Sequence, residues 1–91
     1  MDNVAKLIKF SGMVQGVGFR YTAHRIASRY ELTGYVRNLP GGQVEMFAQG
    51  NADDIRDCVE DLKLSFGQYI RNIEITDVEI DSQYSEFMIK V

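Results

Sequence analysis

At residues 12–20 the sequence reads Gly12-Met13-Val14-Gln15-Gly16-Val17-Gly18-Phe19-Arg20, between a segment that predicts a strand and one that predicts a helix. Glycine tolerates the positive φ angles with which consecutive backbone N–H groups curl toward one point. The start of the helix adds free N–H donors and the positive end of a dipole, and Arg20 adds a permanent charge. These features predict a cradle for a tetrahedral anion such as phosphate. A tight turn followed by a surface arginine fits the same residues.

The composition of the chain bounds the classes of function. Its 91 residues predict one domain, 1–91, and its apolar and charged fractions of 45% and 25% are those of a globular protein. A net charge of −3 argues against nucleic acid as a partner, since such binding needs clustered Lys and Arg. Cys58 is the only cysteine, which excludes an internal disulfide and a cysteine-rich zinc site. With no membrane-span or signal-peptide pattern in the sequence, we expect a cytoplasmic protein without membrane contact.

Hydrophobic periodicity predicts an alternation of strands and helices. The predicted strands are 4–13, 35–38, 44–49, 69–80 (with a bulge or twist) and a short 87–91, and the predicted helices are 21–31 and 51–65. The order β-α-β-β-α-β predicts an α+β, ferredoxin-like split β-α-β sandwich. In this fold two helices cover one face of a mostly antiparallel sheet of four to five strands.

The two predicted helices each have an apolar stripe and distinct ends. The stripe of the first helix is expected at Tyr21, Ile26, Ala27 and Tyr30, and that of the second at Ile55, Cys58, Val59 and Leu62. Asn51 or Asp53 is expected to cap the second helix. His24, the only histidine, has no orienting partner evident in the sequence and is interpreted as a surface residue.

Strand parity relates Asn38 to the glycine-rich loop. Val36 and Asn38 share one face of the strand at 35–38, so a buried Val36 would direct Asn38 toward the helix-covered face. The loop at 12–20 emerges on the same side. We therefore expect Arg20 and Asn38 to meet at one edge of the sheet.

Two motifs together resemble those of the acylphosphatases. Residues 12–20 are similar to the phosphate-binding loop of that family, and Gly34-Tyr35-Val36-Arg37-Asn38, with Gly42, Val44 and Gly50 at the expected offsets, is similar to its second signature. The sequence departs from the family pattern at Phe10, at Met13, where a basic residue is frequent, and at Phe66-Gly67-Gln68, where Gly-Pro is common. The last departure leaves the end of the second helix and the register of the next strand open.

The resemblance implies hydrolysis of the carboxyl–phosphate bond of acyl phosphates, giving a carboxylate and phosphate without a metal or another cofactor. It implies that Arg20 binds the phosphoryl group and that Asn38 holds the attacking water. Donors to the phosphoryl group are then the backbone N–H groups of Gln15, Gly16, Val17, Gly18, Phe19 and Arg20. The expected partner is a small acyl phosphate, and the expected oligomeric state is a monomer.

Three other functions are compatible with parts of the sequence. Similar domains stand at the front of the much longer hydrogenase-maturation carbamoyltransferases, so a module that binds phosphate or carbamoyl phosphate without turnover is one alternative. The same element order also builds the RNA recognition motif, but residues 43–49 contain one aromatic residue and no Lys or Arg. A structural or interaction domain is the third alternative, and the pairing of Arg20 with Asn38 argues against it.

Overall fold

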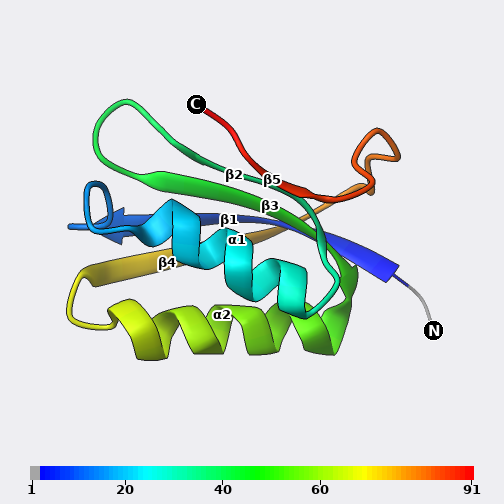
Figure 1. Cartoon of the computed structure of the whole chain (residues 1–91), viewed down its shortest axis with the longest axis horizontal. Helices are drawn as coiled ribbons and strands as arrows, with labels where there is room; N and C mark the ends of the chain where they lie inside the picture. Colours follow the sequence, from blue (N-terminus) through cyan, green and yellow to red (C-terminus); the bar gives the residue numbers. More distant parts are fainter. Residues whose placement is uncertain (1–2) are drawn as a thin grey trace.

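The computed structural model describes residues 3–91 as one five-stranded sheet with two helices on one face (Figure 1). The elements are β1 (Asn3–Gly12), α1 (Phe19–Arg29), β2 (Thr33–Asn38), β3 (Val44–Asn51), α2 (Ala52–Phe66), β4 (Ile70–Val78) and β5 (Phe87–Ile89). The strand order is β4-β1-β3-β2-β5, and all pairs are antiparallel except β2 with β5. The predicted α+β, ferredoxin-like sandwich is confirmed. No helix in this part of the chain is long and apolar enough to cross a membrane.

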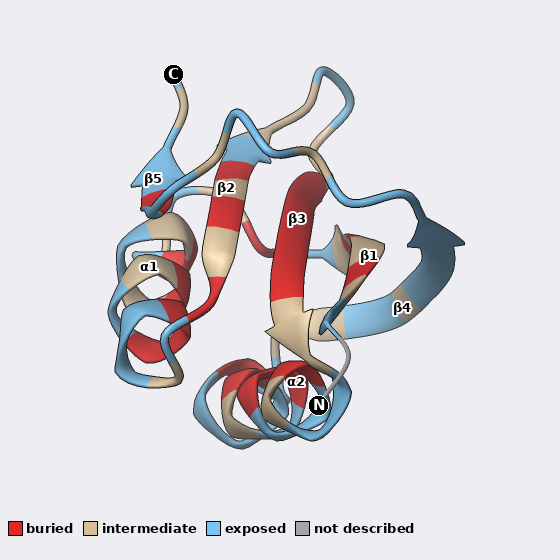
Figure 2. Cartoon of the chain, turned by 90° about the vertical axis from the view of Figure 1, so that its right-hand side faces the viewer, coloured by how far each residue is buried: buried red, intermediate tan, exposed pale blue. Residues whose placement is uncertain are grey.

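Alternating residues of the central strands form the core. Ile8 and Phe10 of β1 lie opposite Met46 and Val44 of β3, and Val36 of β2 also lies opposite Met46. All five side chains are fully buried. Figure 2 shows the buried residues on β2 and β3 and on the sides of both helices that face the sheet. The alternation read from the sequence for these strands is therefore confirmed, and the parity of β2 places its helix-facing residues as expected.

Helix α1 begins two residues earlier than predicted, and this changes its buried stripe. Phe19 takes the first core position, where its ring centroid lies 4.8 Å from that of Phe10 and 4.9 Å from that of Phe66. Its buried residues are Phe19, Ala23, Ile26 and Ala27. The assignment of Tyr21 to the stripe was wrong, since its side chain is 73% exposed. Because residues two positions apart lie on nearly opposite sides of a helix, a buried Phe19 places Tyr21 outside the core.

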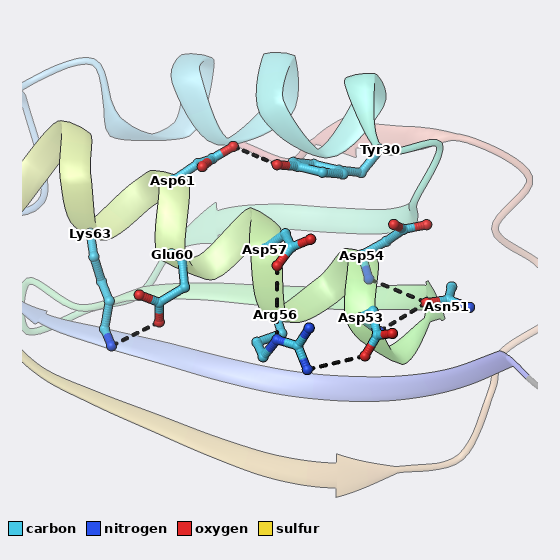
Figure 3. A network of polar contacts seen from close by, with 9 residues as sticks. All are labelled: Tyr30, Asn51, Asp53, Asp54, Arg56, Asp57, Glu60, Asp61 and Lys63. Carbon is cyan, nitrogen blue, oxygen red and sulfur yellow. Dashed lines mark hydrogen bonds and ion pairs between the residues drawn. The ribbon is translucent and has the colours of Figure 1, made fainter.

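Helix α2 agrees with its predicted cap and stripe. The Oδ1 atom of Asn51 accepts hydrogen bonds from the backbone N–H groups of Asp53 at 2.9 Å and of Asp54 at 3.4 Å (Figure 3). The predicted stripe, Ile55, Cys58, Val59 and Leu62, is buried. The hydroxyl of Tyr30, the C-cap residue of α1, donates to the Asp61 carboxylate on α2 at 2.7 Å, so a polar contact joins the end of α1 to α2 (Figure 3).

The expected irregularity in the strand after α2 is a bulge. Ser11 pairs with Asn72 and Gly12 with Ile70, which leaves Arg71 as an extra residue in β4. The extra residue explains why Ile70 and Ile73 do not fit one alternation. The strand ends at Val78 rather than at residue 80, and β5 covers only 87–89 of the predicted 87–91.

Candidate active site

The loop between β1 and α1 leads into a helix whose N-terminus has no side-chain cap. Gly18 is the N-cap residue of α1 in the left-handed conformation, with φ of +81°, which glycine adopts without strain. Gly18 provides no side-chain cap, and the first turn of α1 contains no acidic residue. Helix α2, by contrast, has a side-chain cap and acidic residues in its first turn. Among residues 3–91, no backbone carbonyl accepts a hydrogen bond from the N–H groups of residues 15–20. These donors can therefore bind an anion at the positive end of the helix dipole.

A cavity of about 260 Å³ opens beside this loop. The structure places Arg20 of α1 and Asn38 of β2 in its wall, as the parity of β2 and the position of the loop predicted. The residues that line the cavity are Val14, Gly16, Gly18, Phe19, Arg20, Tyr21, Asn38 and Ile89. Gln15 and Val17, the other two predicted phosphate-binding positions, lie outside this lining; Val17 packs against the core. Tyr21 and Ile89 belong to the cavity although the sequence did not predict them there.

The guanidinium of Arg20 is positioned by the C-terminal end of the chain. Its Nη1 atom donates to the backbone carbonyl of Lys90 at 3.2 Å, and Arg20 is half-buried. No carboxylate within the described part of the chain forms an ion pair with it. A neutral carbonyl orients the guanidinium without cancelling its charge, so the charge remains available to an anion in the cavity.

Asn38 ends β2 with an unpaired amide oxygen. Its Oδ1 atom is buried and accepts no hydrogen bond from any group of residues 3–91. Leaving such an acceptor without a partner costs about 1–3 kcal/mol. Buried polar atoms without partners are few in native proteins, and this one belongs to a residue that lines the same cavity as Arg20. The amide is therefore available to a molecule bound in the cavity.

A side chain that the sequence did not single out ties the loop to the β2–β3 hairpin. The Nε2 atom of Gln15 donates to the carbonyl of Leu39 at 2.9 Å and to that of Gln43 at 2.8 Å. The loop and the hairpin lie at the same end of the molecule (Figure 1). Gln15 thus joins the loop that precedes Arg20 to the hairpin loop that follows Asn38. No local spacing signals this contact, because its partners are 24 and 28 residues away.

The opposite face of the sheet holds β2 in place. The buried carboxylate of Glu45 on β3 accepts hydrogen bonds from the Tyr35 hydroxyl at 2.9 Å and from Nε of Arg37 at 2.8 Å. Burial, and next the hydrogen bond to Glu45, raise the pKa of Tyr35 to about 12, so its hydroxyl remains a donor at neutral pH. These bonds restrain Tyr35 and Arg37, the two residues that flank Val36, and Arg37 immediately precedes Asn38.

Few titratable groups are near the cavity. Its lining contains no His, Asp, Glu or Lys. His24 is half-buried, with its ring centroid 6.3 Å from that of Phe87, and it does not line the cavity. Among residues 3–91, no three His, Cys, Asp or Glu side chains are placed to hold a metal ion.

The fold and the site define an α+β domain of the ferredoxin-like type whose candidate active site lies at the loop after its first strand. The model of the acylphosphatase family matches residues 6–89. The chain is 39% identical to an acylphosphatase of Methanospirillum hungatei over 92 residues, which cover 99% of this chain and 98% of that protein. The structure of an acylphosphatase from Coxiella burnetii superposes with a TM-score of 0.86 at 34% identity, covering 98% and 94% of the two chains.

A third relative is a much longer protein. The chain is 38% identical over 84 residues to a probable carbamoyltransferase HypF of Methanocaldococcus jannaschii, and the match covers 90% of this chain but 11% of that protein.

The family model and the full-length relatives together show that the chain belongs to the acylphosphatase family. It is a hydrolase that acts on acyl phosphates.

Proposed function

We propose that Arg20 and the N–H groups of the loop hold the phosphoryl group of a small acyl phosphate, while Asn38 positions the attacking water. One observation supports this most strongly: Arg20, which has no carboxylate partner, and Asn38, whose buried amide oxygen is unpaired, line the same cavity beside a helix start without a cap. Among residues 3–91, Arg20 has no carboxylate partner, the Asn38 oxygen has no hydrogen-bond partner and the start of α1 has no side-chain cap. A bound phosphate and a water would supply these three partners.

Binding and catalysis follow from the same donors. Phosphoryl transfer passes through a loose transition state with its charge spread over three equatorial oxygens, so fixed positive donors supply most of the stabilisation. Arg20 offers two N–H groups in one plane, and the start of α1 offers backbone N–H groups in a fixed direction. Neither has to reorganise when the charge develops, because the loop is held by Gln15 and Arg20 by the Lys90 carbonyl.

The water is positioned by an amide. Asn38 can accept a hydrogen bond from a water and donate one to it, which restrains the water in two directions. The water oxygen attacks phosphorus while the bond between phosphorus and the acyl oxygen breaks, and the carboxylate leaves with the electron pair. The water proton passes to a phosphoryl oxygen, because the cavity lining offers no carboxylate or imidazole to take it.

The test measures phosphate release from benzoyl phosphate, in the presence of a chelator, by the wild type, Arg20→Gln and Asn38→Ala. We expect turnover with the chelator, loss of both phosphate affinity and rate in Arg20→Gln, and loss of rate alone in Asn38→Ala. In water labelled with heavy oxygen, the label should enter phosphate and not benzoate. Label in benzoate, or chelator-sensitive turnover, would contradict this mechanism.

The pH dependence distinguishes the substrate's own phosphate from His24 as the proton acceptor. Without a side-chain base, kcat should vary little between about pH 6 and 8, where an ordinary histidine titrates. A steep limb in this range that disappears in His24→Gln would assign the proton to His24.

The similarity to a probable carbamoyltransferase supports a second candidate, a module that binds carbamoyl phosphate or phosphate without turning it over. It predicts saturable binding of these anions with no phosphate release from benzoyl, acetyl or carbamoyl phosphate. Release from any of the three at a rate that Arg20→Gln abolishes would exclude this candidate.

A further inference from the structure

We propose that Tyr21, together with Ile89, forms a platform for the acyl group, so that the enzyme selects acyl phosphates whose acyl part is uncharged and apolar over those that bear a second negative charge. This inference rests on the proposed function of the same cavity. It assigns Tyr21 as a specificity residue for the leaving group, a role separate from that of the groups that hold the phosphoryl oxygens.

The exposure of the two side chains is the first observation. Tyr21 is 73% exposed and Ile89 is 39% exposed, and both line the cavity that contains Arg20 and Asn38. The core does not use Tyr21, because Phe19 occupies the buried position at the start of α1. A ligand that covers these two surfaces removes apolar area from water, which is favourable. An acyl group is the part of the substrate that can do so, since the phosphoryl group is held by polar donors.

The position of Tyr21 relative to Arg20 is the second observation. The two residues are consecutive in the first turn of α1, and both line the cavity. The carboxyl carbon of an acyl phosphate is separated from phosphorus by a single bridging oxygen. An acyl group attached there lies within a few bond lengths of the phosphoryl site, and so within reach of the other residues that line the same cavity. An aromatic acyl group can then pack offset-stacked or edge-to-face against the phenol ring.

The distribution of charge is the third observation. Arg20 is the only charged residue in the lining, and it is engaged by the phosphoryl group. The ammonium of Lys90 is directed elsewhere: its Nζ atom lies 4.2 Å from the ring centroid of Tyr35 and donates to the hydroxyl of Tyr84 at 2.8 Å. Arg25, one turn further along α1, is exposed and does not line the cavity. A second carboxylate or phosphate on the acyl group therefore finds no cation in the lining, in a protein of net charge −3.

The test compares kcat/KM for three substrates: benzoyl phosphate, acetyl phosphate and succinyl phosphate. They share the scissile bond and differ in an aromatic ring or a second carboxylate. Tyr21→Ala should lower the ratio of benzoyl to acetyl phosphate by about 3–10-fold, the value of one aromatic pair, and Tyr21→Phe should keep it. Tyr21→Lys should raise the ratio of succinyl to acetyl phosphate by a similar factor. Leu64→Ala, which removes an 86% exposed side chain on α2 away from the cavity, should change neither ratio.

Ratios separate this inference from the proposed function. If Tyr21→Ala leaves the benzoyl to acetyl ratio within twofold of the wild type while Arg20→Gln abolishes turnover, the platform is refuted and the proposed mechanism stands. A wild-type preference for succinyl over acetyl phosphate would also refute it. If the wild type releases phosphate from none of the three substrates, the proposed function itself fails and the platform fails with it. A fall in the benzoyl to acetyl ratio that is confined to Tyr21→Ala and Tyr21→Lys supports the platform. This holds even if thermal unfolding shows that a variant has altered stability, because a ratio of two substrates does not depend on the amount of folded enzyme.

Discussion

Replacing Asn38 by alanine should separate catalysis from stability, because Asn38 lines the cavity and its amide oxygen is buried without a partner among residues 3–91. If Asn38 positions the water, its removal costs rate. If its Oδ1 atom has no protein partner in the folded state, its removal should also relieve a cost of folding. Few substitutions of half-buried polar residues are expected to have both effects.

The two magnitudes follow from the chemistry of the group. Losing one preorganised hydrogen-bonding group of this kind typically lowers kcat by about 10²–10³-fold, or about 2.7–4 kcal/mol of activation free energy. An unpaired buried acceptor costs about 1–3 kcal/mol, and lost packing of the side chain offsets part of the gain on removing it. We expect Asn38→Ala to be about 1 kcal/mol more stable, which raises the melting temperature by about 4–8 °C in a domain of this size.

The assay combines three measurements on one variant. Release of phosphate from benzoyl phosphate gives kcat, titration with inorganic phosphate gives the dissociation constant, and urea unfolding gives the free energy of unfolding. Phosphate affinity should stay within about threefold of the wild type, because Arg20 and the helix start remain in place. Asn72→Ala is the matched control: Asn72 is exposed on β4, outside the cavity lining, so all three quantities should be unchanged.

Two outcomes would refute the reasoning. A kcat within about threefold of the wild type would show that the amide does not position the nucleophile. A variant that loses phosphate affinity and becomes less stable by more than about 1 kcal/mol would show that Asn38 maintains the structure of the cavity.

Three further predictions concern the scaffold. Gly34→Ala should destabilise the protein by about 3 kcal/mol or more, since Gly34 has φ of +132° and a Cβ there would lie 1.8 Å from the carbonyl oxygen of Phe47. Gly41→Ala, also at positive φ but with no atom within 4 Å of the added Cβ, should cost about 1–2 kcal/mol, and equal losses for the two variants in urea unfolding would contradict the close approach. Asn51→Ala should cost about 1 kcal/mol by removing the cap of α2, and Asn51→Asp should restore most of it in the same assay. Burial raises the pKa of Cys58 from 9.0 to about 12, so the folded protein retains a proton that the unfolded chain releases, and its stability should fall as the pH rises from about 9 toward 12. Its thiol should react with a disulfide reagent at pH 8 only as fast as the chain unfolds, and rapid labelling of the folded protein would contradict the burial.

Most of the architecture could be predicted from the sequence because side-chain periodicity is a local property. The 2-residue alternation around Ile8 and Phe10 and the helical spacing of Ile55, Cys58 and Leu62 specify which face of each element is buried, whatever it packs against. The element order then admits few topologies, and a sheet covered on one face is the simplest of them. Element ends were less accurate. The first turn of α1 was missed because a glycine N-cap in the left-handed conformation has no side-chain signature.

The features of the candidate site that follow from strand parity could be predicted from the sequence. Those that depend on contacts between distant residues could not. Asn38 reaches the cavity because it is two residues from buried Val36 on one strand, and this relation is visible in the letters alone. The hydrogen bond of Gln15 to Leu39 and that of Arg20 to Lys90 span 24 and 70 residues, so no local pattern encodes them.

By itself, the sequence determined the order of the elements, the buried face of each one and the edge of the sheet where Arg20 and Asn38 lie. Only the tertiary structure decided that Tyr21 lines the cavity, that the amide oxygen of Asn38 has no partner among residues 3–91 and that the carbonyl of Lys90 orients Arg20. The physical reason is range. Propensity and periodicity act over a few residues, whereas the presence or absence of a partner for a polar atom depends on chain segments that come together only when the sheet has formed.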